Sequence, residues 1–201
     1  MSQEELSSSA EGRDSGEGKK SCTTAKFFML AAILSVLFVT VLMLWGGRDE
    51  LRKVKPGYPA PDFIFRDLNH KEVSLSDYKG KVVLLNLWSI TCPPCIEEVP
   101  QIESLYQQMK GVEDFHLLTV VTNRGETEKE VRPFVEKHGI HFQVLIDNKK
   151  IAWKKYKLTG WPETFLIDRE GIIVEKFIGP KEWASREMIN KLTALVEKKN
   201  G

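Results

Sequence analysis

The sequence predicts an α/β sandwich preceded by one apolar helix. Three observations support this prediction: strand patterns alternate with helical patterns from residue 58 onward, the pattern closes on a strand hairpin, and residues 27–45 form one uncharged apolar run. Strands that alternate with helices favour a central sheet covered by helices. With 42% hydrophobic residues, the 201-residue chain has material for one globular domain with appendages.

Charge and cysteine content narrow the class of protein. The formal net charge of +1 gives no reason to expect a nucleic acid or an acidic surface as partner. Only three cysteines occur, and two of them lie in one short motif. A scaffold held together by disulfides is therefore excluded, and a packed core must supply the stability.

The apolar run Phe27–Trp45 predicts a transmembrane signal anchor. As a helix it would extend about 28 Å, close to the roughly 30 Å of a bilayer's hydrocarbon core. A buried core helix would show an amphipathic stripe, which this run lacks. A cleaved signal peptide is disfavoured because Leu44-Trp45-Gly46 is a poor cleavage site.

The anchor divides the chain into four predicted parts. Residues 1–26, rich in Ser, Glu, Gly and Lys, are expected to form a disordered cytoplasmic tail that carries Cys22 as a free thiol. Residues 46–57 follow the anchor as a linker, and residues 58–201 form the folded domain. Basic residues flank the anchor on both sides, but those at the head of a long translocated domain weigh less. We therefore expect a single-pass protein of the cell membrane, with its C-terminal domain on the extracytoplasmic (periplasmic) side.

The folded domain begins with two short strands joined by the turn Asp67–Lys71, which predicts an N-terminal β-hairpin. All the strand patterns together occupy residues 63–66, 72–74, 82–88, 115–122, 142–146, 163–168 and 172–177. Helical patterns occupy residues 93–109, 126–138 and 182–198.

Two cysteines three residues apart follow the third strand directly, in the sequence Trp88-Ser-Ile-Thr-Cys92-Pro93-Pro94-Cys95. A strand that ends in C-x-x-C is typical of a redox dithiol. The two prolines suit the first turn of a helix, where backbone N–H groups lack partners. Cys92 is then at a helix N-terminus, which stabilises its thiolate and makes it the expected nucleophile.

Several motifs in order give the chain a family resemblance. They are Ala60-Pro-Asp-Phe63, the segment VSLSDYKGKVVLLNLW at residues 73–88, CPPC at residues 92–95 and TGWPETFLID at residues 159–168. Residues 58–198 thereby resemble the membrane-anchored TlpA/ResA-type thioredoxin-like proteins. The resemblance implies a thioredoxin-like central sheet flanked by helices, with an N-terminal β-hairpin extension.

The resemblance also assigns roles near the dithiol. Pro162 matches the proline that follows a cis peptide bond beside the dithiol, although an ordinary proline at a strand start is the simpler alternative. The Trp161 backbone would then pair with an extended substrate peptide. Glu98 matches the acidic residue that ResA-type proteins keep beside the dithiol, and a solvated surface carboxylate is the equal alternative.

Other positions are expected to support the active site or the fold. Trp88, Pro93 and Pro94 frame the two thiols, and Pro100 matches the proline that kinks the helix. Asn86 stands where thioredoxin has a buried Asp. This departure argues against a proton relay from that strand and shifts any carboxylate role to Glu98.

The resulting functional prediction is thiol-disulfide exchange, most simply as a reductase of protein disulfides. The Pro-Pro dipeptide carries no positive charge of the kind that makes strong oxidants. No metal or organic cofactor is needed beyond the redox-active disulfide Cys92–Cys95. The family resemblance implies a transmembrane thiol-electron carrier as reductant and a protein thiol or disulfide substrate, with apocytochrome c as the leading example.

Two alternatives remain open. A peroxiredoxin-like peroxidase would have Ser or Thr three residues before the reactive cysteine and Pro four residues earlier; Ser89 fits, whereas Leu85 does not. A thiolate metallochaperone would require further soft or imidazole ligands, for which His138 and His141 are candidates by residue type alone.

Overall fold

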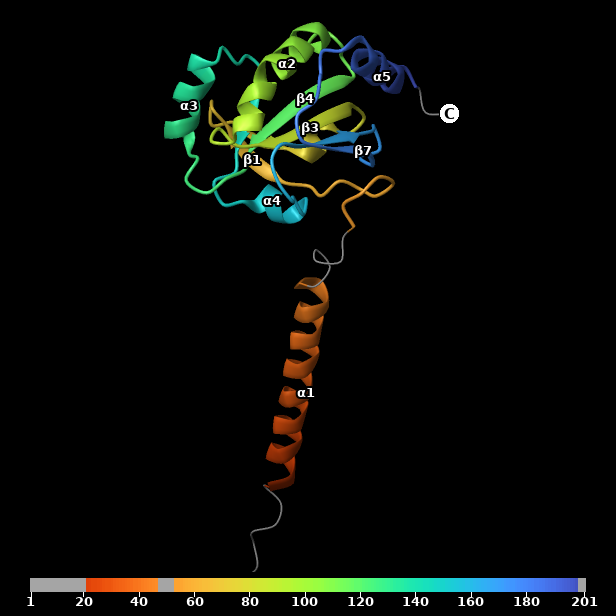
Figure 1. Cartoon of the computed structure of the whole chain (residues 1–201). Helices are drawn as coiled ribbons and strands as arrows, with labels where there is room; N and C mark the ends of the chain where they lie inside the picture. The colour runs from red at the N-terminus through yellow and green to blue at the C-terminus, as the bar shows by residue number, and fades with distance from the viewer. Residues whose placement is uncertain (1–20, 47–52, 199–201) are drawn as a thin grey trace, which may run out of the picture. The chain divides into compact units, whose positions relative to one another are not determined.

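The computed structural model describes residues 21–46 and 53–198. Residues 1–20, in the predicted disordered tail, and residues 47–52, in the predicted linker, lie outside the described residues. The chain divides into two compact units, Met1–Leu51 and Arg52–Gly201. The first contains helix α1 (Ser21–Gly46), and the second contains all the other elements (Figure 1).

The prediction of a transmembrane helix in this fold is wrong. Within the described part of the chain, no helix is both long and apolar enough to cross a membrane.

The second unit is a seven-stranded sheet between two layers of helices and loops. Its order is β2-β1-β5-β4-β3-β6-β7. The strands are β1 (Ile64–Asp67), β2 (Glu72–Ser74), β3 (Val82–Trp88), β4 (Phe115–Val121), β5 (Val144–Ile146), β6 (Glu163–Ile167) and β7 (Ile173–Ile178). The helices are α2 (Pro93–Met109), α3 (Glu128–Lys137), α4 (Ile151–Lys155) and α5 (Arg186–Glu197), with a 3₁₀ turn at Leu75–Tyr78.

The sheet is mixed, and its centre is β3. This strand pairs in parallel with β4 and antiparallel with β6, while β1 and β2 add an antiparallel hairpin beyond β5. Every residue of β3 is buried, as expected for a strand covered on both faces. All seven predicted strands are present, and their ends lie within two residues of the predicted positions.

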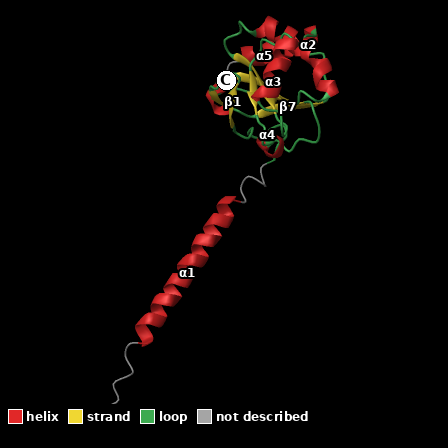
Figure 2. Ribbon diagram, turned by 90° about the vertical axis from the view of Figure 1, so that its left-hand side faces the viewer, coloured by secondary structure: helices red, strands yellow, loops and turns green. Residues whose placement is uncertain are grey.

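Alternation along β3 creates two hydrophobic cores, one on each face of the sheet. Val82 and Leu84 point to the core that α2, α3 and α5 cover, whereas Val83 and Leu85 point to the opposite core, which contains Tyr156 beyond α4. Figure 2 shows α2 and α5 above the strands and α4 below them. Helix α4 was missed by the sequence prediction because five residues are too few to establish a helical period.

Candidate active site

The two cysteines lie where the central strand β3 gives way to α2. Cys92 is the residue that caps α2, and Pro93 and Pro94 occupy its first two positions, as predicted. Cys92 and Cys95 form a disulfide, with their Cα atoms 5.3 Å apart. The Sγ of Cys92 also accepts a hydrogen bond from the Cys95 backbone N–H at 3.4 Å. A helix N-terminus with unpaired N–H groups favours a thiolate at this position when the pair is reduced.

Exposure differs between the two cysteines. Cys92 retains 8% of its surface and Cys95 retains 2%. The disulfide packs in the core covered by α2 and α5, and Trp88, the last residue of β3, packs in the same core against Phe134. An incoming sulfur atom would therefore reach Cys92 first. The assignment of Cys92 as the attacking thiol stays a prediction, which this geometry favours; the more deeply buried Cys95 would then be the resolving thiol, which attacks the mixed disulfide.

The peptide bond between Trp161 and Pro162 is cis, as predicted. Strand β6 begins immediately afterwards, where Glu163 pairs with Leu87 of β3. The cis bond thus lies beside the end of the strand that leads to the dithiol. Among the described residues, no backbone hydrogen bond involves the N–H or C=O of Trp161. This edge is available to an extended peptide, and substrate binding there stays a prediction.

Glu98 is buried, with 2% of its surface exposed, so the alternative of a solvated surface carboxylate is wrong. Its Oε1 accepts a hydrogen bond from the indole N–H of Trp183, which is fully buried beside α5. Its Oε2 has no hydrogen-bond partner in the described part of the chain. Burial raises the pKa of Glu98 to about 7, against the opposing effects of Trp183 and Lys181. The side chain can therefore hold or release a proton near neutral pH.

Asn86 also lies where the prediction put it, inside the sheet. It is 1% exposed, and its Nδ2 donates to the Thr164 hydroxyl at 2.9 Å. This contact joins β3 to β6 and presents no ionisable group to the dithiol. Of the two positions considered for a proton acceptor, only Glu98 carries a carboxylate.

A second buried carboxylate, Glu126, was missed by the sequence analysis. It is 4% exposed and lies just before α3, yet it binds the loop that precedes Cys92. Its Oε1 accepts from the hydroxyls of Ser89 at 2.5 Å and Thr91 at 2.7 Å and from the Asn123 amide at 3.0 Å. Its Oε2 accepts from the Ile90 N–H at 3.3 Å. These contacts fix the turn that leads into the nucleophile.

A third buried carboxylate, Glu163, follows the cis proline directly. Its Oε1 accepts from the N–H and hydroxyl of Thr159, at 2.9 and 2.6 Å. Its Oε2 forms an ion pair with Nζ of Lys176 at 2.7 Å. Both ends of the turn that contains Trp161 are thereby tied to one side chain. The sequence offered no signal for this role, because Lys176 lies on a different strand.

The residues that favoured the alternative functions have other partners. Ser89, which fitted the peroxidase pattern, donates to Glu126. Leu85, where that pattern has proline, lies fully buried within β3. His138 stacks on Phe134 with ring centroids 4.1 Å apart, and His141 pairs with Glu103 at 2.9 Å. None of these contacts brings an imidazole to the dithiol.

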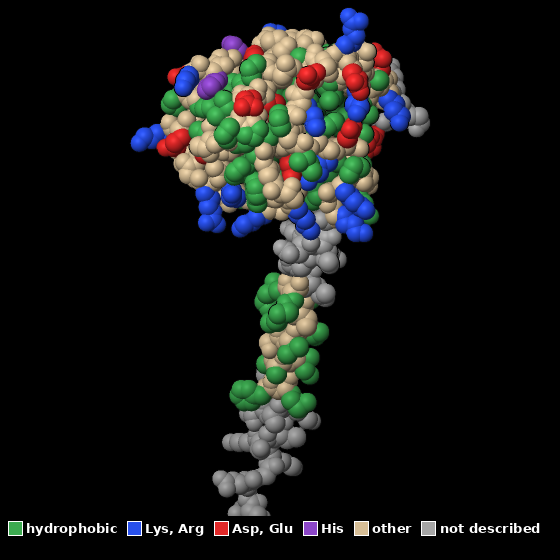
Figure 3. All heavy atoms as spheres, viewed as in Figure 1, with side chains coloured by type: hydrophobic (Ala, Val, Ile, Leu, Met, Phe, Trp, Pro, Cys, Tyr) green, Lys and Arg blue, Asp and Glu red, His purple; other side chains and the backbone are tan. Residues whose placement is uncertain are grey.

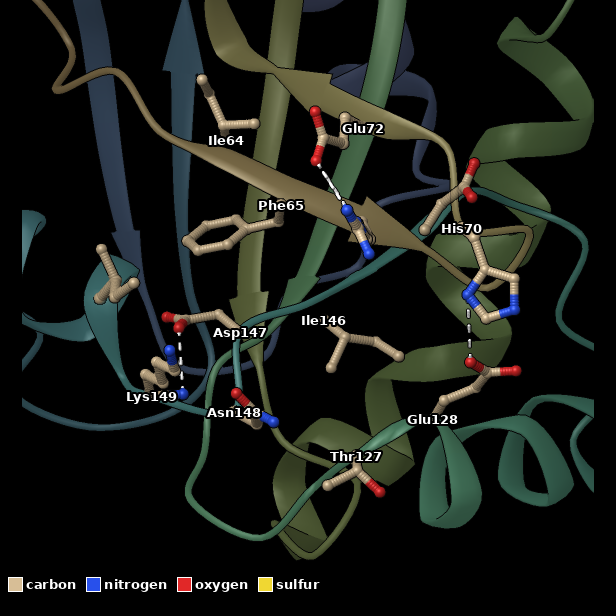
Figure 4. A pocket seen from close by; sticks show the side chains of 13 residues that line it. Ile64, Phe65, His70, Glu72, Thr127, Glu128, Ile146, Asp147, Asn148 and Lys149 are labelled. Atoms are coloured by element: carbon tan, nitrogen blue, oxygen red, sulfur yellow. Dashed lines mark hydrogen bonds and ion pairs between the residues drawn. The ribbon is translucent and has the colours of Figure 1, made fainter.

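A pocket of about 330 Å³ lies away from the dithiol and the cis proline (Figure 4). It opens between β1, β5 and the start of α3, where His70 faces Glu128 at 3.5 Å. Neither the cysteines nor the cis proline line it. Of the dithiol, Cys92 retains 8% of its surface, and this is the part that an incoming polypeptide can reach.

The sequence is similar to a known protein family and to named relatives. The model of the AhpC/TSA family matches residues 56–176. A thiol-disulfide oxidoreductase ResA of Bacillus cereus is 39% identical over 132 residues, which are 65% of this chain and 73% of the relative. ResA of Bacillus subtilis (strain 168) is 33% identical over 153 residues, 75% of this chain and 81% of the relative.

Solved structures agree with the sequence matches. The thioredoxin domain of a thiol-disulfide oxidoreductase from Bacteroides vulgatus superposes with a TM-score of 0.61 at 25% identity. The match covers 72% of this chain and 100% of that domain. The thioredoxin-like fold extends over the whole sheet and its helices.

Proposed function

Because the chain belongs to the AhpC/TSA family and is a thioredoxin-like thiol-disulfide oxidoreductase of the ResA type, we propose that it reduces disulfides in polypeptide substrates through Cys92. The observation that carries this proposal is the disulfide between Cys92 at the N-terminus of α2 and the less exposed Cys95. This arrangement supplies a reactive thiol and a resolving thiol in one helical turn.

The reaction starts from the reduced dithiol. The Cys92 thiolate attacks one sulfur of the substrate disulfide, the substrate S–S bond breaks, and the departing sulfur takes up a proton. Cys95 then loses its proton and attacks the Cys92 sulfur, which releases the second substrate thiol. Two electrons pass from the protein to the substrate, whose two sulfur atoms take up the proton lost by Cys95 and one proton from solvent, and the Cys92–Cys95 disulfide forms. Sulfur chemistry alone balances the reaction, so it requires no metal or organic cofactor.

Glu98 is proposed to accept the proton that Cys95 must lose. It lies three residues after Cys95 on α2, and its Oε2 has no hydrogen-bond partner among the described residues. With a pKa raised to about 7 by burial, the carboxyl group is present in both protonation states near neutral pH. A group with such a pKa can take up a proton in one step and return it in another.

The proposed direction of the reaction is reduction of the substrate, and its proposed location is outside the cytoplasm. Pro93 and Pro94 add no positive charge that would make the dithiol a strong oxidant, which supports reduction of substrates. Each turnover leaves the protein oxidised, so a separate thiol-electron carrier, a transmembrane protein in this proposal, must restore the dithiol. We place the domain outside the cytoplasm, where protein disulfides persist. Apocytochrome c is the proposed substrate that the ResA resemblance favours.

A trapping experiment tests this function. Replacement of Cys95 by Ala removes the resolving thiol, so the mixed disulfide with substrate should accumulate on Cys92. The reduced variant is mixed with an oxidised disulfide peptide and analysed by peptide mapping under non-reducing conditions. Cys92→Ala is the matched control and should form no adduct. An adduct that forms on Cys95 in the Cys92→Ala protein faster than the adduct on Cys92 in the Cys95→Ala protein would reverse the assigned roles.

A further inference from the structure

A cluster of lysines lies beside the predicted substrate edge and has no role in the chemistry described so far. Helix α4 and the two residues before it carry four lysines, which we call the α4 lysines: Lys149, Lys150, Lys154 and Lys155. Three of them are exposed, and Lys150 is half-buried. Figure 3 shows Lys and Arg side chains gathered along the lower edge of the domain, the side on which α4 lies in Figure 1.

Asp147, the acidic residue closest to this cluster along the sequence, does not neutralise it. Asp147 is only 2% exposed, and its Oδ2 accepts from the Thr122 hydroxyl and the Ala152 N–H, each at 2.7 Å. Its Oδ1 accepts from the backbone N–H of Lys149 at 3.3 Å, a contact drawn in Figure 4. Because Asp147 binds the start of α4 from inside, the lysine charges remain on the surface.

Lys150 connects the cluster to the active site. Its Nζ lies 4.4 Å from the ring centroid of Trp153 and 4.7 Å from that of Trp161. The two rings meet edge to face at 4.6 Å. Trp161 is the residue before the cis proline, and it packs against the core that contains Cys92. A positive charge therefore lies over the residue whose backbone is proposed to pair with substrate.

The backbone at Lys150 is unusual for a lysine. It has φ of 59°, in the left-handed region that side chains with a Cβ seldom adopt. Such a conformation is disfavoured for a side chain with a Cβ and persists only when the surroundings favour it. Here the Lys150 N–H donates to the Asp147 carbonyl at 3.4 Å, and its Nζ lies over the two tryptophan rings. The strain places a cation beside the substrate edge where Gly or Asn would fit the backbone better.

We propose that the protein selects disulfide substrates whose polypeptide carries acidic side chains next to the cysteine, and that the α4 lysines, with Lys150 foremost, attract them. The proposal rests on the proposed function. It favours a polypeptide over a lipid surface because Lys150 contacts Trp161 itself, which flanks the edge where a peptide would pair. Attraction of this kind raises the association rate and is screened by salt.

The test uses three synthetic peptides, each with one internal disulfide and two flanking residues that are Glu, Gln or Lys. Full-length protein is reduced, freed of reductant and mixed with each peptide, and the single-turnover rate of peptide reduction is measured. We expect the Glu peptide to react about three- to tenfold faster than the Lys peptide in a buffer of about 50 mM ionic strength. This ratio should approach one at about 0.5 M salt.

Variants locate the effect. Lys150→Gln should lower the ratio of the Glu-peptide rate to the Lys-peptide rate about two- to threefold. Lys150→Arg keeps the positive charge and should leave the ratio at its wild-type value. Lys137→Gln, which removes one exposed positive charge from α3 on the opposite face of the sheet, should leave the ratio unchanged. The ratio is internal to each protein, so a general loss of activity does not alter it.

The outcomes separate the two proposals. A reduced wild-type protein that reduces none of the peptides and no small neutral disulfide contradicts the proposed function. One that reduces all three peptides at equal rates in low salt contradicts only the charge preference. Vesicles of anionic lipid supply the remaining comparison: equal peptide rates together with vesicle binding that Lys150→Gln and Lys154→Gln abolish would make the α4 lysines a lipid site, and the proposal would be overturned.

Discussion

Glu98 and Glu126 are both buried carboxylates next to the dithiol, but their surroundings differ. Glu126 accepts hydrogen bonds from four groups, three on one oxygen and one on the other. Glu98 accepts one, from Trp183, and leaves its second oxygen without a partner among the described residues. A carboxylate surrounded by donors is held in one position, whereas burial in an apolar setting with a single donor raises the pKa of Glu98.

The difference suggests that the two carboxylates have different roles near Cys92 and Cys95. Glu126 acts as a positioning residue, because its partners form the turn that leads to Cys92. The role proposed for Glu98 is proton transfer, because its Oε2 has no hydrogen-bond partner among the described residues and its raised pKa suits a group that changes its protonation state. Burial alone does not distinguish these roles; the number of donors does.

The largest expected effect comes from removing the carboxylate with the most donors. Glu126→Ala leaves the buried Ser89 hydroxyl and its neighbours without an acceptor and should lower the free energy of unfolding by about 3–5 kcal/mol. Glu126→Gln keeps one oxygen and should lose about 1–2 kcal/mol. Urea unfolding of the oxidised proteins measures both. Equal losses in the two variants would show that the acceptor oxygens are not what matters.

The next largest effect concerns pH. The pKa of Glu98 is raised in the folded protein from the ordinary 4.5 to about 7, so the folded state binds more protons than the unfolded state between these values. The contribution of Glu98 protonation to the free energy of unfolding is fully present below pH 4.5. It is lost as the pH rises through 7, by about 3 kcal/mol in total. Glu98→Gln should remove this decline.

The comparison is made on the oxidised proteins, in which the cysteines do not titrate. Unfolding free energies of wild type and Glu98→Gln are measured across this pH range, and other carboxylates cancel in the difference. Parallel curves for the two proteins would contradict a raised pKa at Glu98. In the reduced proteins, the same variant should slow the release of substrate from the mixed disulfide.

The smallest effect isolates the single donor of Glu98. Its hydrogen bond from Trp183 lowers the pKa, so Trp183→Phe should raise the pKa of Glu98 further, by an amount equivalent to about 1–2 kcal/mol. The midpoint of the pH-dependent loss of stability should move upward. Phe177→Leu removes the ring that packs edge to face on Trp183 but leaves the indole N–H that donates to Glu98 in place. It should lower stability without moving the midpoint, and a shift in both variants would attribute the effect to packing.

Most of the fold could be predicted because its signals are local. The seven strands and the helices α2, α3 and α5 were indicated by apolar periodicity and by turn residues such as those between β1 and β2. The two elements that were predicted wrongly or missed also depended on local sequence patterns. Helix α4 is too short to show a period, and the uncharged run at residues 27–45 predicted a membrane span that the described part of the chain does not support.

The sequence by itself determined the dithiol, its place at a strand-to-helix junction and, through its family resemblance, the cis bond at Pro162. Each depends on residues a few positions apart, whose relations the helix or turn fixes. Only the tertiary structure decided what surrounds them. Trp183 donates to Glu98 from 85 residues away, and Glu126 binds Ser89 across 37 residues. Such contacts depend on how the sheet and helices pack, and burial and hydrogen bonding at these contacts determine which carboxylate can exchange a proton.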